Sequence, residues 1–236
     1  DAEIQTVLGQ FLAPDFPLSE NQRRSLLVAL GTGLRTRGKT MLSALSPMQR
    51  PVFDTLCDSA ISQASQDGVY KPAIALLSFA PKEKAVPALA ALLKPQAMPQ
   101  LQQAVIAALG DLPGSEGALA ALGKWRELSP EMRRSTVEIL LRDRGRVDGL
   151  LSAIDTDAVK QSELSPEQWQ SLLGHPELSV RERASALRGL VSKDREAVIA
   201  QYRETAESGG DIERGRLVFK KTCSVCHKIG DRKSVV

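Results

Sequence analysis

The residues with the greatest chemical potential lie near the C-terminal end, in the sequence KTCSVCHKIG at 221–230. Cys223, Cys226 and His227 include two of the chain's three cysteines and one of its two histidines. Cys-x-x-Cys-His is the attachment signature of c-type haem. Each thiol can form a thioether to a haem vinyl group, and the adjacent imidazole can then bind the iron as proximal ligand. The spacing therefore predicts one covalently attached haem c, held by Cys223 and Cys226 and ligated by His227.

Two other uses of this motif stay open. A zinc site needs about four nitrogen or sulfur ligands, and beyond the motif the chain offers only Cys57 and His175. A dithiol redox site of the thioredoxin kind expects a strand-to-helix context and has no use for His227. We keep a metal or thiol-redox Cys-x-x-Cys site as an alternative.

The composition favours an all-α protein that does not bind nucleic acid. Only 4% of the 236 residues are aromatic, and Ala and Leu, which are strong helix formers, predominate. The net charge of +3, from 31 basic and 28 acidic residues, provides no basic field for nucleic acid. No apolar run approaches the ~18 residues of a membrane span, and the first residues do not resemble a signal peptide. Because the chain begins without Met, we expect a piece of a longer polypeptide.

Apolar residues recur at helical spacing from about residue 20 to 203, between Pro, Gly and Ser punctuation. One predicted helix has a one-sided stripe of apolar positions: Leu101, Ala104, Val105, Ala108, Leu109 and Leu112. A second has Phe53, Leu56, Cys57, Ala60 and Ala64. Because Cys57 belongs to such a stripe, we expect a buried and unreactive thiol.

Four serines are predicted to cap helix N-termini. Ser165 and Ser129 are each followed by Pro at the first helical position, and Ser165 has Gln three residues later. Ser46 opens a similar S-P-M-Q sequence, and Ser179 opens a capping box without Pro. These are devices of stability, with no chemical role.

An internal repeat indicates an α-solenoid. The stripe that starts at Leu101 aligns with a second stripe that starts at Met132, at a constant offset of 31 residues. Each lies in the second helix of a pair, which is typical of solenoids of helical hairpins. We therefore predict a HEAT-like repeat domain over residues 1–205, with surfaces free for partners. A basic group in it could mark a partner site or simply be solvated: Arg133, Arg134, Arg142, Arg144 and Arg146.

A polar, Gly-rich join at 206–210 separates this domain from a short helical segment and the Cys-x-x-Cys-His motif. The sequence GDIERGRLVF at 210–219, followed by the motif, resembles the first helix of a class I cytochrome c. In that family a small residue and an aromatic four positions later pack against the last helix of the domain. Gly215 and Phe219 occupy those positions, so the resemblance implies a cytochrome c domain beginning at 211–230.

Most of the chain has a wider resemblance. The phrases YKPAIALL at 70–77, KWRELSP at 124–130 and VRERA at 180–184, with the haem motif after them, resemble the C-terminal region of planctomycete- and verrucomicrobium-type haem-binding, membrane-bound dehydrogenase-like proteins. Members typically carry a β-propeller, HEAT-like repeats and one cytochrome c domain. The resemblance covers nearly all of residues 20–230, but only the haem motif is specific residue by residue.

The resemblance implies a fragment of an exported oxidoreductase, located in the periplasm or otherwise outside the cytoplasm. Electrons would pass from an upstream dehydrogenase domain through the haem to a redox protein partner, with Lys220, Lys221 and Lys228 available to steer an acidic partner. No nucleophilic triad, phosphate loop or paired carboxylate site is evident, so we expect this chain to transfer electrons without catalysing a reaction. The alternative from another class is a non-enzymatic HEAT-like scaffold whose Cys-x-x-Cys-His carries no haem.

The chain departs from the cytochrome pattern after the motif. It ends nine residues after His227, whereas the family supplies a sixth haem ligand, usually Met, on a later loop. The four methionines, which we expect to be core fillers, all precede the motif: Met41, Met48, Met98 and Met132. Residues 231–236 match the translation of a widely used sequencing adapter. We therefore expect the natural sequence to end near Gly230 and the tail to be non-native.

Overall fold

We obtained a computed structural model in which residues 2–66 and 70–224 are described. This part of the chain is entirely helical and contains no strand, which confirms the all-α class. It divides into two units, 1–187 and 188–236, and the boundary falls within one long helix. The predicted residues Cys226, His227 and Lys228 and the predicted tail at 231–236 lie outside the described residues.

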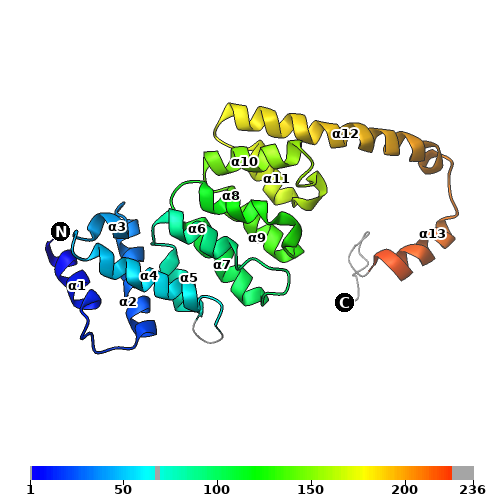
Figure 1. Cartoon of the computed structure of the whole chain (residues 1–236). Helices are drawn as coiled ribbons and strands as arrows, with labels where there is room; N and C mark the ends of the chain where they lie inside the picture. The colour runs from blue at the N-terminus through cyan, green and yellow to red at the C-terminus, as the bar shows by residue number, and fades with distance from the viewer. Residues whose placement is uncertain (1, 67–69, 225–236) are drawn as a thin grey trace. The chain divides into compact units, whose positions relative to one another are not determined.

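The first unit consists of short helices joined by turns (Figure 1). Their bounds are α1 Ala2–Leu12, α2 Glu20–Thr36, α3 Met41–Ala44, α4 Arg50–Gln63, α5 Tyr70–Leu77, α6 Lys82–Ala90, α7 Pro99–Asp111, α8 Glu116–Gly123, α9 Pro130–Leu140, α10 Arg144–Asp155 and α11 Pro166–Leu173. Two 3₁₀ turns, η1 Trp125–Glu127 and η2 Gln161–Glu163, and the start of α12 Leu178–Glu207 complete the unit.

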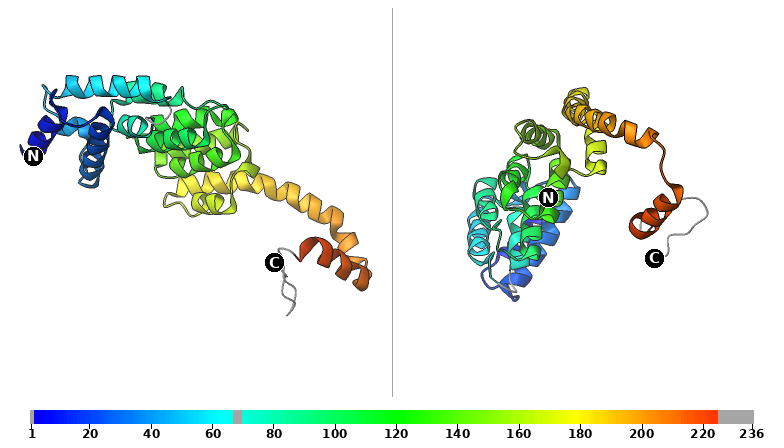
Figure 2. Two further views of the ribbon diagram at one scale, coloured as in Figure 1. Left: turned by 90° about the horizontal axis from the view of Figure 1, so that it is seen from below. Right: turned by 90° about the vertical axis from the view of Figure 1, so that its right-hand side faces the viewer.

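Helices of the first unit pack in two rows. In one row α2 contacts α5, α5 contacts α7 and α7 contacts α9. In the other α4 contacts α6, α6 contacts α8 and α8 contacts α10. The rows are joined by contacts between sequential helices, such as α6 with α7 and α8 with α9, and Figure 2 shows the same neighbours from two further directions.

The predicted apolar stripes form the core of this unit. In α7 the stripe is buried at Leu101, Val105, Ala108 and Leu109, with Ala104 half-buried. The aligned stripe of α9 is buried at Met132, Thr136, Ile139 and Leu140. The stripe of α4 is buried throughout, including Cys57. Both the helical positions and the burial of Cys57 are confirmed.

Two of the predicted N-caps are confirmed. The Ser165 side chain accepts a hydrogen bond from the Gln168 N–H, and Gln168 accepts one from the Ser165 N–H, forming a capping box at α11. The Ser129 side chain accepts a hydrogen bond from the Met132 N–H at α9. In both helices Pro occupies the first turn, where its missing N–H has no intrahelical partner to lose.

The other two predicted N-caps are wrong. Helix α4 begins only at Arg50, and residues 47–49 form a turn, because Pro51 has no N–H to continue the helical ladder back to Pro47. Helix α12 begins at Leu178, one residue before Ser179. Ser179 therefore lies inside the first turn; the Arg181 guanidinium donates to the His175 carbonyl just before it, at 2.7 Å.

Two further expectations need correction. Helix α1 lies before residue 20, where the helical pattern was expected to begin, and it buries Leu8 and Leu12. Met41 and Met132 are core residues as expected, but Met48 is 87% exposed and Met98 is 42% exposed. Both exposed methionines lie outside the apolar stripes, Met48 in the turn before α4 and Met98 at the N-cap of α7.

The basic group predicted at 133–146 is largely tied into the fold. Arg146 is 6% exposed, and its guanidinium donates to the carbonyls of Gly110, Leu112, Gly114 and Ile139 at 2.7 to 3.3 Å. Arg133 pairs with Glu163. Arg146 therefore fits neither of the two expected roles, partner site or solvated charge, because it lies on the buried side of α10, whereas Arg134, Arg142 and Arg144 are exposed.

The second unit contains the distal part of α12, then α13 Ile212–Val218 and a π-helical turn at Phe219–Cys223. Helix α12 extends through Glu207, two residues into the join predicted at 206–210. Gly209, between the two helices, has φ +68°, a conformation that favours glycine.

Candidate functional site

The Cys-x-x-Cys-His sequence begins at the end of the π-helical turn that follows α13, and the start of α13 is well defined. Asp211 is the N-cap, and its Oδ1 atom accepts hydrogen bonds from the N–H groups of Glu213 and Arg214, both at 3.0 Å. The carboxylate also lies at the positive end of the helix dipole. This cap fixes the residue at which α13 begins, eleven positions before Cys223.

The helix widens just before the motif. The N–H of Ser224 donates to the carbonyl of Phe219 at 2.9 Å, an i to i−5 bond that closes the π-helical turn. The Ser224 hydroxyl also donates to the carbonyl of Lys220 at 2.8 Å. Such turns often accompany functional sites. Cys223 lies at the end of this turn as a free, half-buried thiol.

The apolar residues of α13 lie on the surface of the structure. Ile212, Leu217 and Val218 are 78%, 68% and 56% exposed. Gly215 is exposed and has open space where a side chain would be, and Phe219 is half-buried. The segment that leads to the motif thus presents an apolar surface of the kind that marks an interaction site.

Basic residues flank the first cysteine. Lys220 and Lys221 belong to the π-helical turn and are exposed.

Cys57 and His175, the two possible zinc ligands outside the motif, both have structural surroundings of their own in the first unit. Cys57 is fully buried in α4, and burial, with smaller effects of Asp54 and Asp58, raises the pKa of its thiol to about 12. His175 accepts a hydrogen bond at Nδ1 from the Glu177 N–H at 3.2 Å. Over residues 2–66 and 70–224 no group of three or more His, Cys, Asp or Glu side chains could hold a metal ion.

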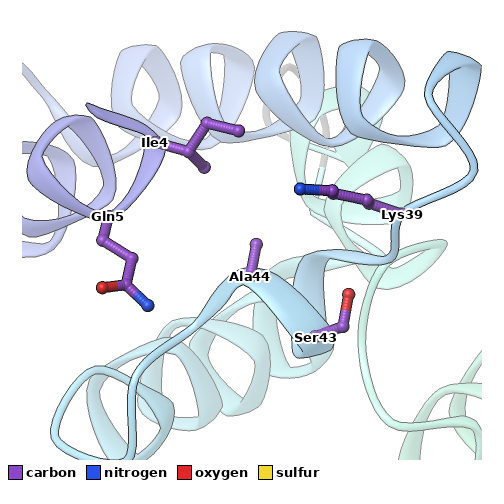
Figure 3. Close-up of a pocket in the computed structure, with 5 residues that line it drawn as sticks. All are labelled: Ile4, Gln5, Lys39, Ser43 and Ala44. Carbon is purple, nitrogen blue, oxygen red and sulfur yellow. The ribbon is translucent and has the colours of Figure 1, made fainter. Parts of the chain in front are cut away.

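Several hollows lie in the first unit. One of about 300 Å³ lies between α1 and α3, and Figure 3 shows the Lys39 ammonium group pointing into the space between Ile4 and Ala44. Another, of about 270 Å³, has Phe79 and Arg35 in its lining. Sequence patterns did not single out these residues, although Arg35 begins a short basic sequence, RTRGK, at 35–39.

None of the described helices combines the length and the hydropathy that crossing a membrane requires. Comparisons of the chain with protein-family models, with curated proteins and with solved structures gave no match.

Proposed function

We propose that this chain is a c-type cytochrome electron-transfer module on a HEAT-like scaffold, within a larger exported oxidoreductase. The observation that carries the proposal is the Cys-x-x-Cys-His sequence, whose first cysteine is a free, partly exposed thiol in the turn that follows a capped helix. A thiol that must form a thioether has to be reachable, and Cys223 is, whereas Cys57 is not.

Cys223 and Cys226 would hold the haem and His227 would ligate its iron. The cofactor would supply reversible one-electron oxidation and reduction. The apolar surface of Ile212, Leu217 and Val218 supports this role, because haem and the polypeptide around it would remove such a surface from water. Lys220 and Lys221 would favour an acidic redox partner or an upstream dehydrogenase domain.

The scaffold part of the proposal is supported by the two rows of helices in the first unit. Each helix contacts the corresponding helix of the next pair, as α6 does with α8 and α7 with α9. This is the nearest-neighbour packing of helical repeats. The same packing is the one observation that favours the alternative function, a protein-interaction scaffold without haem.

Expression in a host that matures and exports c-type cytochromes tests the proposal. Intact mass measured after denaturation and gel staining for covalent haem should both detect haem on the chain. Both signals should disappear in the Cys223→Ala, Cys226→Ala double variant. The Cys57→Ala variant, which also loses a thiol, should keep the haem.

Haem that is equally present in the double variant would contradict attachment at the motif. A chain that is exported and folded but carries no haem would favour the scaffold. Zinc bound in stoichiometric amount, or a reversible disulfide between Cys223 and Cys226, would favour the metal or thiol-redox alternative.

A further inference from the structure

An apolar hollow with a basic rim lies among the ends of four elements of the first unit: α2, α3, α5 and α7. Its volume is about 270 Å³, enough to take one bulky apolar side chain. Its lining includes Phe79, Met41, Leu42 and Pro113, with Arg35, Lys39 and Asp111 as charged members. None of these residues belongs to the proposed haem site.

The floor of the hollow is held in place by close packing. Phe79 is 9% exposed and lies against α2 at Gly31. A Cβ atom on Gly31 would come within 2.7 Å of the Phe79 ring, so only glycine allows the ring to lie there. The aromatic floor is therefore a fixed feature, and Met41 beside it is fully buried.

The rim has more positive than negative charge. The Arg35 guanidinium lies 4.4 Å from the centre of the Phe79 ring and donates to the Ser78 carbonyl at 3.3 Å. It meets the Asp111 carboxylate at 3.5 Å, while Arg142 donates to the other oxygen of Asp111 at 3.2 Å. One carboxylate thus stands between two guanidinium groups.

Arg35 is placed to exchange partners. Its distance to Asp111 exceeds the roughly 2.7 to 2.9 Å of a strong charge-assisted hydrogen bond, and both side chains are partly exposed. Asp111 would stay paired with Arg142 if Arg35 turned to another carboxylate. Lys39, labelled in Figure 3, lines both this hollow and its neighbour and adds to the positive rim.

We propose that this hollow binds an acidic segment of a partner protein, which places one bulky apolar side chain on Phe79 and one carboxylate on Arg35. Charge complementarity selects an acidic partner, and the apolar floor requires a bulky side chain between its acidic residues. The proposal does not depend on haem attachment.

Fluorescence anisotropy with labelled peptides tests it on the full chain. The probe is acetyl-Glu-Asp-Phe-Glu-Asp-amide, compared with the same peptide carrying Ser in place of Phe and with a Lys-Lys-Phe-Lys-Lys peptide. We expect the acidic Phe peptide to bind at least about tenfold more tightly than either, and binding should weaken as salt is added. Amide hydrogen exchange should show protection at 35–42 and 78–80.

Variants separate binding from stability. Arg35→Gln should weaken binding about tenfold or more, whereas Arg35→Lys should retain part of it. Arg126→Gln is the control, because Arg126 is an exposed arginine elsewhere in the unit. Circular dichroism verifies that each variant is folded, and the exchange footprint on the wild-type chain provides a result that needs no variant.

The proposal is overturned by absence of binding at millimolar peptide, by equal affinity for the Ser peptide, or by a footprint elsewhere. It is also overturned if Arg126→Gln weakens binding as much as Arg35→Gln. If the chain self-associates and Arg35→Gln abolishes this, the hollow binds a second copy of the chain, which contradicts the proposal of an acidic partner.

Discussion

Cys57 and Arg146 are both buried, but the fold accommodates them differently. Burial is the main cause that raises the pKa of the Cys57 thiol to about 12; Asp54 and Asp58 also raise it, and Lys84 and Arg24 act in the opposite direction. Arg146 instead finds four backbone carbonyls at the ends of α7 and α9 and in the turn after α7. Burial makes the Cys57 thiol unreactive, whereas Arg146 holds the ends of neighbouring helices together through its hydrogen bonds.

Cys57 should resist alkylation in the folded chain. With a pKa near 12, almost none of it is the reactive thiolate at pH 8, whereas Cys223 is accessible. Iodoacetamide labelling of a Cys223→Ser, Cys226→Ser variant, followed by mass spectrometry, should therefore modify Cys57 only after unfolding. A Cys226→Ser variant should be labelled at Cys223 while folded. Labelling of Cys57 in the native chain at the rate of Cys223 would refute this.

Replacement of Arg146 should be costly. Arg146→Met leaves several carbonyls without a donor, and we expect a loss of about 3 kcal/mol or more in the free energy of unfolding. Arg146→Lys should recover only part of it, since one ammonium cannot span the fork of acceptors.

Urea unfolding measures the difference in the free energy of unfolding between each Arg146 variant and the wild-type chain. The control is Arg144→Met on the same helix, where the side chain is 58% exposed and its ion pairs lie at the surface. That change should cost under about 1 kcal/mol. Equal losses for the two methionine variants would contradict the role given to Arg146.

At the scale of helices, two features hold neighbouring elements together: a close approach at Gly117 and an acidic bridge at Glu163. Gly117 lets α8 lie against the backbone of α7, because a Cβ there would be 2.3 Å from the carbonyl oxygen of Leu109. Glu163, in η2, accepts hydrogen bonds from the indole of Trp125 and from its own turn and pairs with Arg133.

Gly117→Ala should lower the free energy of unfolding by about 1 to 3 kcal/mol, since the backbone atom it meets cannot move aside without separating α7 and α8. Gly123→Ala is the matched control, because nothing lies within 4 Å of a Cβ at that end of α8. Thermal unfolding should show the control unchanged or slightly stabilised. A neutral Gly117→Ala would show that the helices do not approach so closely.

Glu163 should make stability fall in acid. Partial burial alone would raise the pKa of Glu163, but hydrogen bonds from the Lys160 N–H and the Trp125 indole, with Arg133, lower it below the usual value. A carboxyl with a lowered folded-state pKa contributes stability above its unfolded pKa of about 4.3, and this is lost as pH falls through the folded value.

Glu163→Gln should therefore destabilise the chain by about 1 to 3 kcal/mol at pH 7, and the difference from wild type should shrink below about pH 4. Urea unfolding across this pH range tests the prediction. Glu138→Gln, at an exposed position on α9, is the control for loss of a carboxylate without buried partners. A difference that stays constant with pH would mean that ionisation of Glu163 is not involved.

For the whole molecule, periodicity predicted the helices and their buried faces well. A one-sided row of apolar side chains, such as the one that begins at Leu101 in α7, is stable only when it packs against other apolar side chains. Helix ends were less predictable. Ser46 and Ser179 look like caps locally, but α4 begins later, at Arg50, where Pro51 occupies the first turn, and α12 begins earlier, at Leu178.

Buried arginines could be recognised only indirectly. Arg146 precedes Leu150 by four residues and Arg24 precedes Leu27 by three, so each lies on the apolar face of its helix. The partners of Arg146 are tertiary, since its carbonyl acceptors come from residues 32 to 36 positions away or from another helix. Arg24 bonds both to Glu20 and Asn21 of its own helix and to Ser59 and Gln63 of α4. The hollow at Phe79 was missed for the same reason, since its residues meet only in the fold.

The Cys-x-x-Cys-His sequence is the reverse case, since the haem attachment that we propose for it is inferred from five consecutive residues. The predictions for Cys226 and His227, and the proposed cytochrome c character of residues 211–230, rest on that sequence and on the free thiol of Cys223. The all-α class is established, while the HEAT-like scaffold remains a proposal supported by the two rows of helices.

The most direct test of the central claim is the reduced pyridine-haem spectrum of the exported and purified chain, recorded beside the Cys223→Ala, Cys226→Ala variant. Our account predicts the band position of a haem bound through two thioethers in the wild-type chain, and no haem in the variant. A wild-type chain that is folded and exported with the maturation machinery, yet gives no such band, would contradict it.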